Sequence, residues 1–343
     1  MNVSVAMATY NGAAFLAEQL ASIAGQTLRP AELVVSDDGS TDATLDIVTR
    51  FKARAPFPVR ILENDARLGF GDNFLHAAQA CRQPLIAFSD QDDVWLPDKL
   101  RAAAERLEAD RSLLAMHTLT VTDSALRPTG FQWNPGISRD CRHPPLTLHP
   151  FGTGWGNTML FRAELLGLIP RERRPRQPGQ DRPLSHDTWI YVLASALGAV
   201  SHLITPLILY RQHGANVSGQ TRQRKRNRWR ALIRVPIGEY REHDRFDADM
   251  ARLFAELAAR PGPYGDAAAQ AAERYRQRRA YWASRVGVFD QARFGDRFGS
   301  FRRTRALTAD APLWIGSRAK DFVLGVTRLG SSPIGSWLLD QKM

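Results

Sequence analysis

The sequence predicts an α/β fold in which a mostly parallel sheet lies between helices, and three observations support this prediction. First, short apolar segments alternate with amphipathic segments along residues 1–219. Second, the apolar segments at 3–8, 32–35 and 85–88 each run directly into a polar loop. Third, the apolar segments are separated by stretches long enough to hold a helix, as parallel strands require. The loops are therefore expected at one edge of the sheet, where open α/β proteins bind ligands.

The loop after the segment at 85–88 is strongly acidic. Asp90, Asp92 and Asp93 fall within four positions, and a helix is predicted to begin near Pro97, where the missing N–H of proline costs nothing. Three carboxylates this close repel one another unless a cation lies among them. Mg²⁺ or Mn²⁺ suits such a place, because these ions bind one or two carboxylates together with substrate phosphates. The alternative is a solvated acidic turn that caps the helix.

The polar loops after the earlier strands contain groups that suit a nucleotide. Tyr10 offers an aromatic face for a base, and the pair Asp37-Asp38 could accept the imide N–H of uracil or thymine. The segment at 59–62 runs into a further polar loop that contains Arg67. Taken singly, these residues also fit a rim aromatic, an ordinary turn and a helix cap. Together, loops of this kind after consecutive strands predict a nucleotide site.

The ordered set of motifs at residues 9–12, 35–42 and 89–95 resembles the signatures of glycosyltransferase family 2. The Gln-Asp-Asp-Val-Trp form of the last motif resembles the bacterial rhamnosyltransferase-like branch of that family. The resemblance covers residues 3 to about 218. It implies the GT-A fold, a nucleotide-diphospho-sugar donor such as a dTDP- or UDP-sugar, a divalent metal ion and inversion at the anomeric carbon.

The resemblance also suggests roles for individual residues. Asp92 corresponds to the main metal ligand, and Asp90 completes the Asp-x-Asp pair. His213 is expected either to complete the metal shell or to bond the diphosphate. Arg211 is expected to neutralise the departing diphosphate. The candidate residues for donor binding are Ala8, Tyr10, Asn11, Asp37, Asp38, Arg67, Asp90 and Arg211.

Residues 152–162 resemble the family's segment beneath the acceptor, and Asp187 matches the position of its catalytic base. The residue before the base is often Glu in the family, whereas His186 stands here, as in the rhamnosyltransferase-like branch. The candidate acceptor-side residues are Trp155, Gly156, Asn157 and His186. Trp155 could be a platform for a sugar ring or could simply pack in its loop, and Asp187 could instead cap its helix.

Other parts of the first 219 residues carry weaker patterns. Residues 113–116 are expected to form a strand that is followed by a long loop, and the Pro- and Arg-rich segment 171–185 is expected to be a mobile acceptor-side loop or an insertion. The longest apolar stretch, 189–210, contains Gly198 and Pro206, so we interpret it as a helix and a strand of the core rather than a membrane span.

The charge of the chain is unevenly distributed. The net charge is +11, and residues 221–343 hold 25 Lys+Arg against 13 Asp+Glu. Residues 1–220 hold 21 and 22, which leaves them near neutrality. No nucleic-acid-binding signature accompanies the excess, so nucleic acid is not an expected partner. An anionic membrane surface is the expected partner instead.

We predict a catalytic domain at 1–219 and a basic, mainly helical extension at 220–343. Two amphipathic helices are predicted near 246–257 and 275–289. They are expected to pack as a hairpin, to meet anionic lipid through a basic face, or both. Cys81 and Cys141 lie in no recognisable metal-ligand spacing, which fits a reducing compartment. With no secretory signal visible, the chain is expected in the cytoplasm, peripheral on the inner face of the membrane.

The resulting hypothesis is a metal-dependent inverting glycosyltransferase. It would move a sugar, with rhamnose as a candidate, to a hydroxyl of a growing cell-envelope glycan, with a lipid-linked glycan or an oligosaccharide as acceptor. A sugar-nucleotide nucleotidyltransferase is one alternative, but residues 10–12 lack the Gly-rich, basic loop expected after its first strand. A non-catalytic glycan-binding or scaffold protein is the other, and the acidic motifs argue against it.

Overall fold

The computed structural model describes residues 1–151, 154–214, 237–290 and 293–307 of the 343-residue chain. The chain divides into two compact units. The first comprises residues 1–174 and 184–217, and the second comprises residues 175–183 and 218–343.

The first unit is built on a 10-stranded mixed sheet in which the main path runs β3-β2-β1-β4-β9-β6-β10-β5. β7 pairs with β6, and β8 pairs with β10. The strands are β1 Val3–Thr9, β2 Glu32–Asp37, β3 Val59–Glu63, β4 Leu85–Ser89, β5 Val94–Trp95, β6 Leu114–Thr122, β7 Pro128–Trp133, β8 Cys141–His143, β9 Met159–Arg162 and β10 Val200–Arg211.

The strands β3, β2, β1 and β4 run parallel, as predicted. The chain moves outward from β1 to β2 and β3, and then returns to the other side of β1 as β4. The carboxyl ends of β1 and β4 therefore form a topological switch point, where a crevice opens in α/β sheets. The acidic loop follows β4 at this point.

The remainder of the sheet is mixed. β9 runs antiparallel between β4 and β6, and β5 runs antiparallel to β10. The prediction of a long loop after residue 116 was wrong in part. β6 continues to Thr122, and both β7 and β8 lie in the region predicted to be a loop. Most residues of β7 are exposed, so its sequence lacks the apolar alternation that identifies a half-buried strand.

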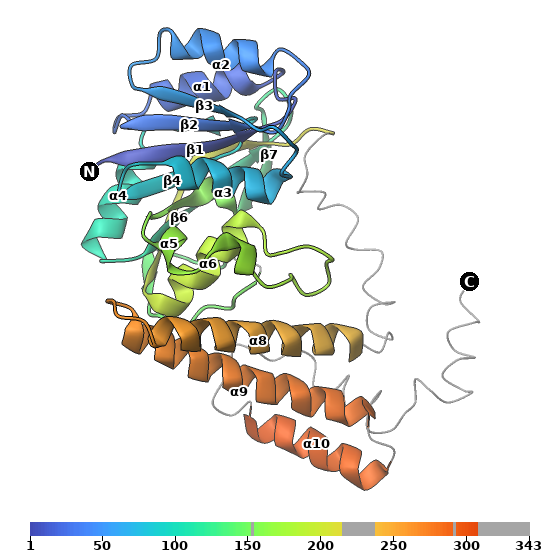
Figure 1. The fold of residues 1–343 in the computed structure, drawn as a ribbon. Helices are drawn as coiled ribbons and strands as arrows, with labels where there is room; N and C mark the ends of the chain where they lie inside the picture. Colours follow the sequence, from blue (N-terminus) through green and yellow to red (C-terminus); the bar gives the residue numbers. More distant parts are fainter. Residues whose placement is uncertain (152–153, 215–236, 291–292, 308–343) are drawn as a thin grey trace, which may run out of the picture. The chain divides into compact units, whose positions relative to one another are not determined.

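Helices cover both faces of the sheet (Figure 1). Alternate residues of β1 (Val3, Val5 and Met7) belong to one core cluster with apolar residues of α1 Leu16–Ala24, α2 Thr44–Lys52 and α4 Lys99–Ala109. Because side chains alternate across a strand, the opposite face meets other helices, α3 Phe70–Ala80 and α6 His186–Leu197. Phe74 of α3 packs against Phe88 of β4 at 5.5 Å between ring centres. Short helical turns complete this unit at α5 Leu165–Leu168, η1 Gly156–Thr158 and η2 Arg171–Arg173.

The second unit contains α8 Ile237–Ala258, α9 Gly265–Asp290 and α10 Phe294–Leu307. Both predicted amphipathic helices are confirmed, whereas α10 was not predicted. A fully buried ion pair joins α8 to α9, with Nε of Arg278 2.9 Å from Oδ1 of Asp247. Residues 175–183, expected to be a mobile loop, belong to this unit, and the N–H of Gly179 donates to Glu242 of α8 at 2.5 Å.

The apolar stretch at 189–210 forms the end of α6 and most of β10, which confirms its interpretation as core. Across the described ranges of the chain, every helix is either too short or too polar to cross a membrane.

Candidate active site

The loops after β1 and β4 are joined by two hydrogen bonds between the side chain of Gln91 and the backbone of Tyr10. The carboxamide of Gln91 accepts from the N–H of Tyr10 at 2.9 Å and donates to the carbonyl of Tyr10 at 3.1 Å. A Cβ on Gly12 would lie 2.2 Å from Oε1 of Gln91, so a larger residue at this position would displace the Gln91 carboxamide from Tyr10. The loop after β1 and the acidic loop after β4 are therefore held in one fixed arrangement.

The donor side of this arrangement presents an aromatic ring next to a cation. Tyr10 is 37% exposed, and the guanidinium carbon of Arg67 lies 3.9 Å from the centre of its ring. Ala8 is half-buried near the end of β1, beside Ser36 of β2. Arg67 thus covers part of the face that was predicted to stack on a base.

The side chains of Asp37 and Asn11 form hydrogen bonds within the loops that follow β1 and β2. The carboxylate of Asp37 accepts from the N–H of Ser40 at 2.8 Å and from the hydroxyls of Ser40 and Thr9 at 2.6 and 2.7 Å. Asn11 has a φ of 47°, and its Oδ1 accepts from the N–H of Thr41 at 2.8 Å. Both side chains, which were predicted to take part in donor binding, are therefore engaged within the protein.

Asp38 organises the loop after β3. Its two carboxylate oxygens accept from the N–H groups of Leu68 and Gly69 at 2.6 and 2.8 Å. Asp38 is 4% exposed, and Arg67 approaches it to 3.9 Å. Asp38 thereby positions Arg67 over Tyr10, and it stays the candidate for the base contact because a carboxylate can accept more than two hydrogen bonds.

Carboxylates converge at the acidic loop. Burial, and then the nearby charges of Asp93, Asp92 and Asp187, raise the pKa of Asp90 well above its ordinary value. Oδ2 of Asp92 lies 2.8 Å from Nε2 of His213, which follows β10. Crowded carboxylates beside an imidazole nitrogen form an oxygen- and nitrogen-rich donor set that fits a divalent cation, because the cation would relieve the repulsion among like charges.

Asp187 lies at the first turn of α6 with one carboxylate oxygen held. Oδ1 accepts from the N–H of Thr188 at 2.7 Å and from the hydroxyl of Ser185. Within the described ranges, Oδ2 makes no hydrogen bond. A Cβ on Gly156 would lie 3.3 Å from Cβ of Asp187 and 2.6 Å from Nε2 of His186, so glycine permits the chain before β9 to reach this helix end.

This arrangement of motifs agrees with a comparison of the sequence with protein-family models. Residues 4–166 match the model of Glycosyl transferase family 2. An uncharacterized glycosyltransferase of Nostoc sp. is 30% identical over 223 residues, which are 63% of this chain and 66% of that protein. Residues 4–166 are a glycosyltransferase family 2 domain.

Further relatives and one fold neighbour extend the comparison. The dTDP-rhamnosyl transferase RfbG of Shigella flexneri is 28% identical over 237 residues, which are 65% of this chain and 80% of that protein. The crystal structure of S. aureus TarS 1–349 in complex with UDP aligns with a TM-score of 0.56 at 18% identity, over 100% of this chain and 92% of that one. At this identity the likeness shows a shared fold, which is the GT-A fold predicted from the sequence.

Three of the expected acceptor-side residues of this glycosyltransferase have other surroundings. Trp155 packs between Trp133 and Tyr210, with ring centres 5.3 and 5.1 Å away. The side-chain amide of Asn157 donates to Oδ2 of Asp93 at 2.7 Å, beneath the acidic loop. His186 is buried and stacks on Phe74 at 4.0 Å, and burial lowers its pKa to about 4. The contacts observed for these three side chains are therefore those of packing and support.

Arg211 also differs from its expected surroundings. Its side chain is buried, and it donates to the carbonyl of Asp92 at 2.9 Å, to the carbonyl of Ser124 at 2.6 Å and to the carboxylate of Glu18. Its backbone N–H donates to Asp93 at 3.2 Å. Arg211 therefore holds the acidic loop from inside the protein, because its guanidinium is committed to protein groups.

Sequence reasoning missed a buried lysine beside the acidic loop, and it gave no role of its own to Asp93, the third carboxylate of that loop. Lys99 is 1% exposed, with its Nζ 3.9 Å from the centre of the Trp95 ring. Burial lowers the pKa of Lys99 to about 7, against the attraction of Asp93 and Asp90. Burial and the charge of Asp92 raise the pKa of Asp93 to about 8. A lysine in the first turn of a helix ordinarily faces solvent, so no sequence signal marks this one.

Proposed function

We propose that this glycosyltransferase transfers a sugar from a nucleotide-diphospho-sugar to an acceptor hydroxyl by a single inverting displacement, with Asp187 as the base. The observation that carries the proposal is the pattern of hydrogen bonds around the carboxylate of Asp187. One of its oxygens is fixed at the start of α6, the other accepts no hydrogen bond from a described residue, and its charge acts on Asp90 of the acidic loop. A base needs this combination of a fixed orientation and an available oxygen close to the reacting centre.

In the proposed step, the free oxygen of Asp187 accepts the proton of the acceptor hydroxyl. The hydroxyl oxygen forms a bond to the anomeric carbon while the bond from that carbon to the diphosphate oxygen breaks, and the diphosphate leaves with the electron pair. The hydroxyl of Ser185 and the N–H of Thr188 keep the base from rotating.

Asp92 and His213 would hold the divalent cation, with Asp90 beside them. When bound, Mg²⁺ or Mn²⁺ would supply positive charge for the diphosphate oxygens of the donor. Arg211 and Asn157 support this loop from below, because Arg211 holds the Asp92 carbonyl and Asn157 holds the Asp93 carboxylate.

For the donor we propose a dTDP- or UDP-sugar, with dTDP-rhamnose first. Support comes from the relative in Shigella flexneri, whose name is dTDP-rhamnosyl transferase, and from the fold neighbour TarS, which was solved with UDP and with UDP-GlcNAc. The acceptor we propose is a hydroxyl of a growing cell-envelope glycan, either lipid-linked or a free oligosaccharide.

A thermal-shift screen with Mn²⁺ tests the proposed function. We expect dTDP-rhamnose to raise the Tm more than UDP-galactose, UDP-N-acetylglucosamine or GDP-mannose, because a ligand that binds the native state stabilises it. At a ligand concentration of about 100 Kd the gain is about 2.7 kcal/mol. Release of free nucleoside diphosphate from the same donor would demonstrate turnover. If no nucleotide sugar shifts the Tm, with or without metal, the chain is not a nucleotide-sugar enzyme.

We also propose that residues 221–236 attract the chain to anionic membrane surfaces. This segment, which lies outside the described residues, holds seven Lys+Arg and no Asp or Glu. Residues 237–290 hold nine Arg and nine Asp+Glu, so α8 and α9 are balanced in charge and are not the source of the basic excess that was expected to form their outer face.

Co-sedimentation with vesicles tests this attraction. We expect the full chain to bind vesicles that contain anionic lipid and to dissociate as salt rises, because the Debye length falls from about 10 Å at 0.1 M to about 3 Å at 1 M. Replacing the seven basic residues of 221–236 with Gln should weaken binding more than replacing Arg241, Arg245, Arg252, Arg276 and Arg279 of α8 and α9. Equal binding to neutral vesicles would contradict an electrostatic attraction.

A further inference from the structure

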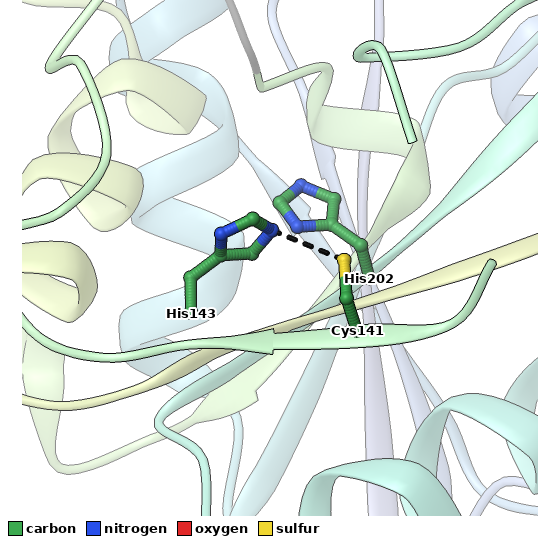
Figure 2. Close-up of side chains that lie close together, drawn as sticks. All are labelled: Cys141, His143 and His202. Atoms are coloured by element: carbon green, nitrogen blue, oxygen red, sulfur yellow. Dashed lines mark hydrogen bonds between the residues drawn. The ribbon is translucent and has the colours of Figure 1, made fainter. Parts of the chain in front are cut away.

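Three side chains that suit a metal ion gather at the end of the sheet opposite the active site. Cys141 and His143 are two residues apart on β8, so both project from the same face of the strand. His202 of β10 is the cross-strand partner of Cys141 in the antiparallel ladder, and its ring projects to that face as well. Figure 2 shows the three side chains directed toward one another.

The distances among the candidate ligand atoms suit a single ion. Sγ of Cys141 lies 3.2 Å from Nε2 of His143, and the ligand atoms of all three residues lie within 4.8 Å of one another. Around tetrahedral Zn²⁺, with Zn–S near 2.3 Å and Zn–N near 2.0–2.1 Å, neighbouring ligand atoms are about 3.5 Å apart. Closing the group around an ion therefore takes side-chain movements of about 1 Å.

His202 supplies an independent observation. It is 2% exposed, and neither of its ring nitrogens has a hydrogen-bond partner among the residues that the structure describes. Buried polar side-chain atoms nearly always have a partner, so a buried imidazole with two unmatched nitrogens needs an explanation. A metal ion at the group would bind one of them.

We propose that Cys141, His143 and His202 bind one Zn²⁺ ion through one thiolate and two imidazole nitrogens, with the fourth position open to water. Thiolate and imidazole favour Zn²⁺, whereas Mg²⁺, Mn²⁺ and Ca²⁺ prefer oxygen ligands.

The charges around the group suit the bound ion. One Zn²⁺ and one thiolate leave a net charge of about +1. The carboxylates of Asp110 and Asp140 act electrostatically on Cys141, and so do the cations Arg106 and Arg139. Arg106 is already paired with Asp110 at 2.7 Å, which leaves Asp140 as the nearby anion without such a pairing in the described structure.

The group lies at the other end of β10 from the active site. His202 pairs with Met116 of β6 and Arg211 pairs with Thr122, so at about 3.3 Å per residue of β6 the two ends of β10 are roughly 20 Å apart. The zinc site therefore lies well away from the active site. β8 is only three residues long, and the group ties it to β10. A bound ion would therefore attach the long connection between β7 and β9, which contains β8, to the sheet.

Metal analysis of the full-length protein tests the proposal independently of sugar transfer. After dialysis against a chelating resin, wild-type protein is expected to retain about one zinc per chain. Cys141→Ser and His202→Ala should lower zinc affinity by 10²-fold or more, because losing even a partner of a ligand costs about 10–100-fold. Cys81→Ser is the matched control, since it removes the other thiol and should leave zinc binding unchanged.

Cobalt substitution identifies the sulfur ligand. Wild type and Cys81→Ser loaded with Co²⁺ should show a thiolate-to-cobalt charge-transfer band that Cys141→Ser lacks. The Asp92–His213 site has no sulfur and cannot produce this band. The proposal is overturned if wild type retains no zinc and shows no such band, or if Cys141→Ser binds zinc as tightly as wild type. If Cys141→Ser does not fold, the proposal is tested by whether the thiolate-to-cobalt band is present in wild type and in Cys81→Ser.

Discussion

Asp187→Asn is expected to lower kcat by roughly 10²–10⁴-fold while the Kd for the donor stays within about twofold. The substitution preserves the shape of the side chain and removes its basicity. Oδ1 can still accept from Thr188 and Ser185, so the start of α6 should stay intact. A loss confined to kcat identifies an interaction that is made in the transition state. Transfer rate and donor affinity should be measured side by side on folded protein.

Ser185→Ala is the matched control for Asp187→Asn. It removes one hydrogen bond to Oδ1 and alters the residue before α6, but it leaves the carboxylate. If Asp187 only caps the helix, both variants should lower the Tm and neither should lower kcat greatly. His186→Ala is a poor control, because His186 lies among Phe70, Phe74 and Phe88 and its removal opens a cavity there. Near-normal turnover of Asp187→Asn would exclude Asp187 as the base.

Asp92→Asn is expected to abolish the metal-dependent part of donor binding. The substitution removes the charged oxygen that lies 2.8 Å from His213, and a neutral amide is a much weaker ligand for Mg²⁺ or Mn²⁺. Donor affinity in the presence of Mn²⁺ should fall to the value measured in EDTA. Asp90→Asn should have a smaller effect, since its main contribution is charge near the ion. Calorimetric titration of the donor with and without Mn²⁺ measures both.

Asp98→Asn is the matched control for Asp92→Asn. Asp98 lies close by in sequence, but its carboxylate is exposed and bonds to Thr27 and Arg101 outside the acidic loop. Donor binding by Asp98→Asn should keep its full response to Mn²⁺. An unchanged Mn²⁺ response in Asp92→Asn would remove Asp92 from the metal site.

The strands and loops of the switch point were predictable because their sequence signals are local. The segments at 3–8, 32–35 and 85–88 are apolar and end at polar motifs, and the structure places a strand at each. The alternation of strands with helices also predicted the parallel part of the sheet. A short exposed strand such as β7 carries no comparable signal, because five of its six residues are exposed.

The supporting contacts of the site were not predictable, because each joins residues far apart in the chain. Gln91 reaches Tyr10, and Asn157 reaches Asp93. Trp155 looked like a sugar platform because it lies among glycines, and only the three-dimensional structure places Trp133 and Tyr210 against it.

The expectation that neither cysteine lies in a metal-ligand pattern has the same cause. Cys141 and His143 are only two residues apart, which by itself is a weak signal, and the third member of the group is on β10. A cross-strand register decides which histidine faces Cys141, and that register follows from the pairing of β8 with β10. A sequence pattern does not report it.

The place of β10 in the sheet sets an order of events during synthesis. Among the strands of the described chain, β10 is the last to leave the ribosome, yet β5, β6 and β8 all pair with it. Strands β1 to β4 can associate earlier, because their partners are already present. Until Arg211 and His213 emerge, Asp92 and Asp93 lack the cation and the imidazole that hold them. The nascent chain therefore carries an incomplete sheet with open edges for most of its translation, and such edges are where newly made chains aggregate.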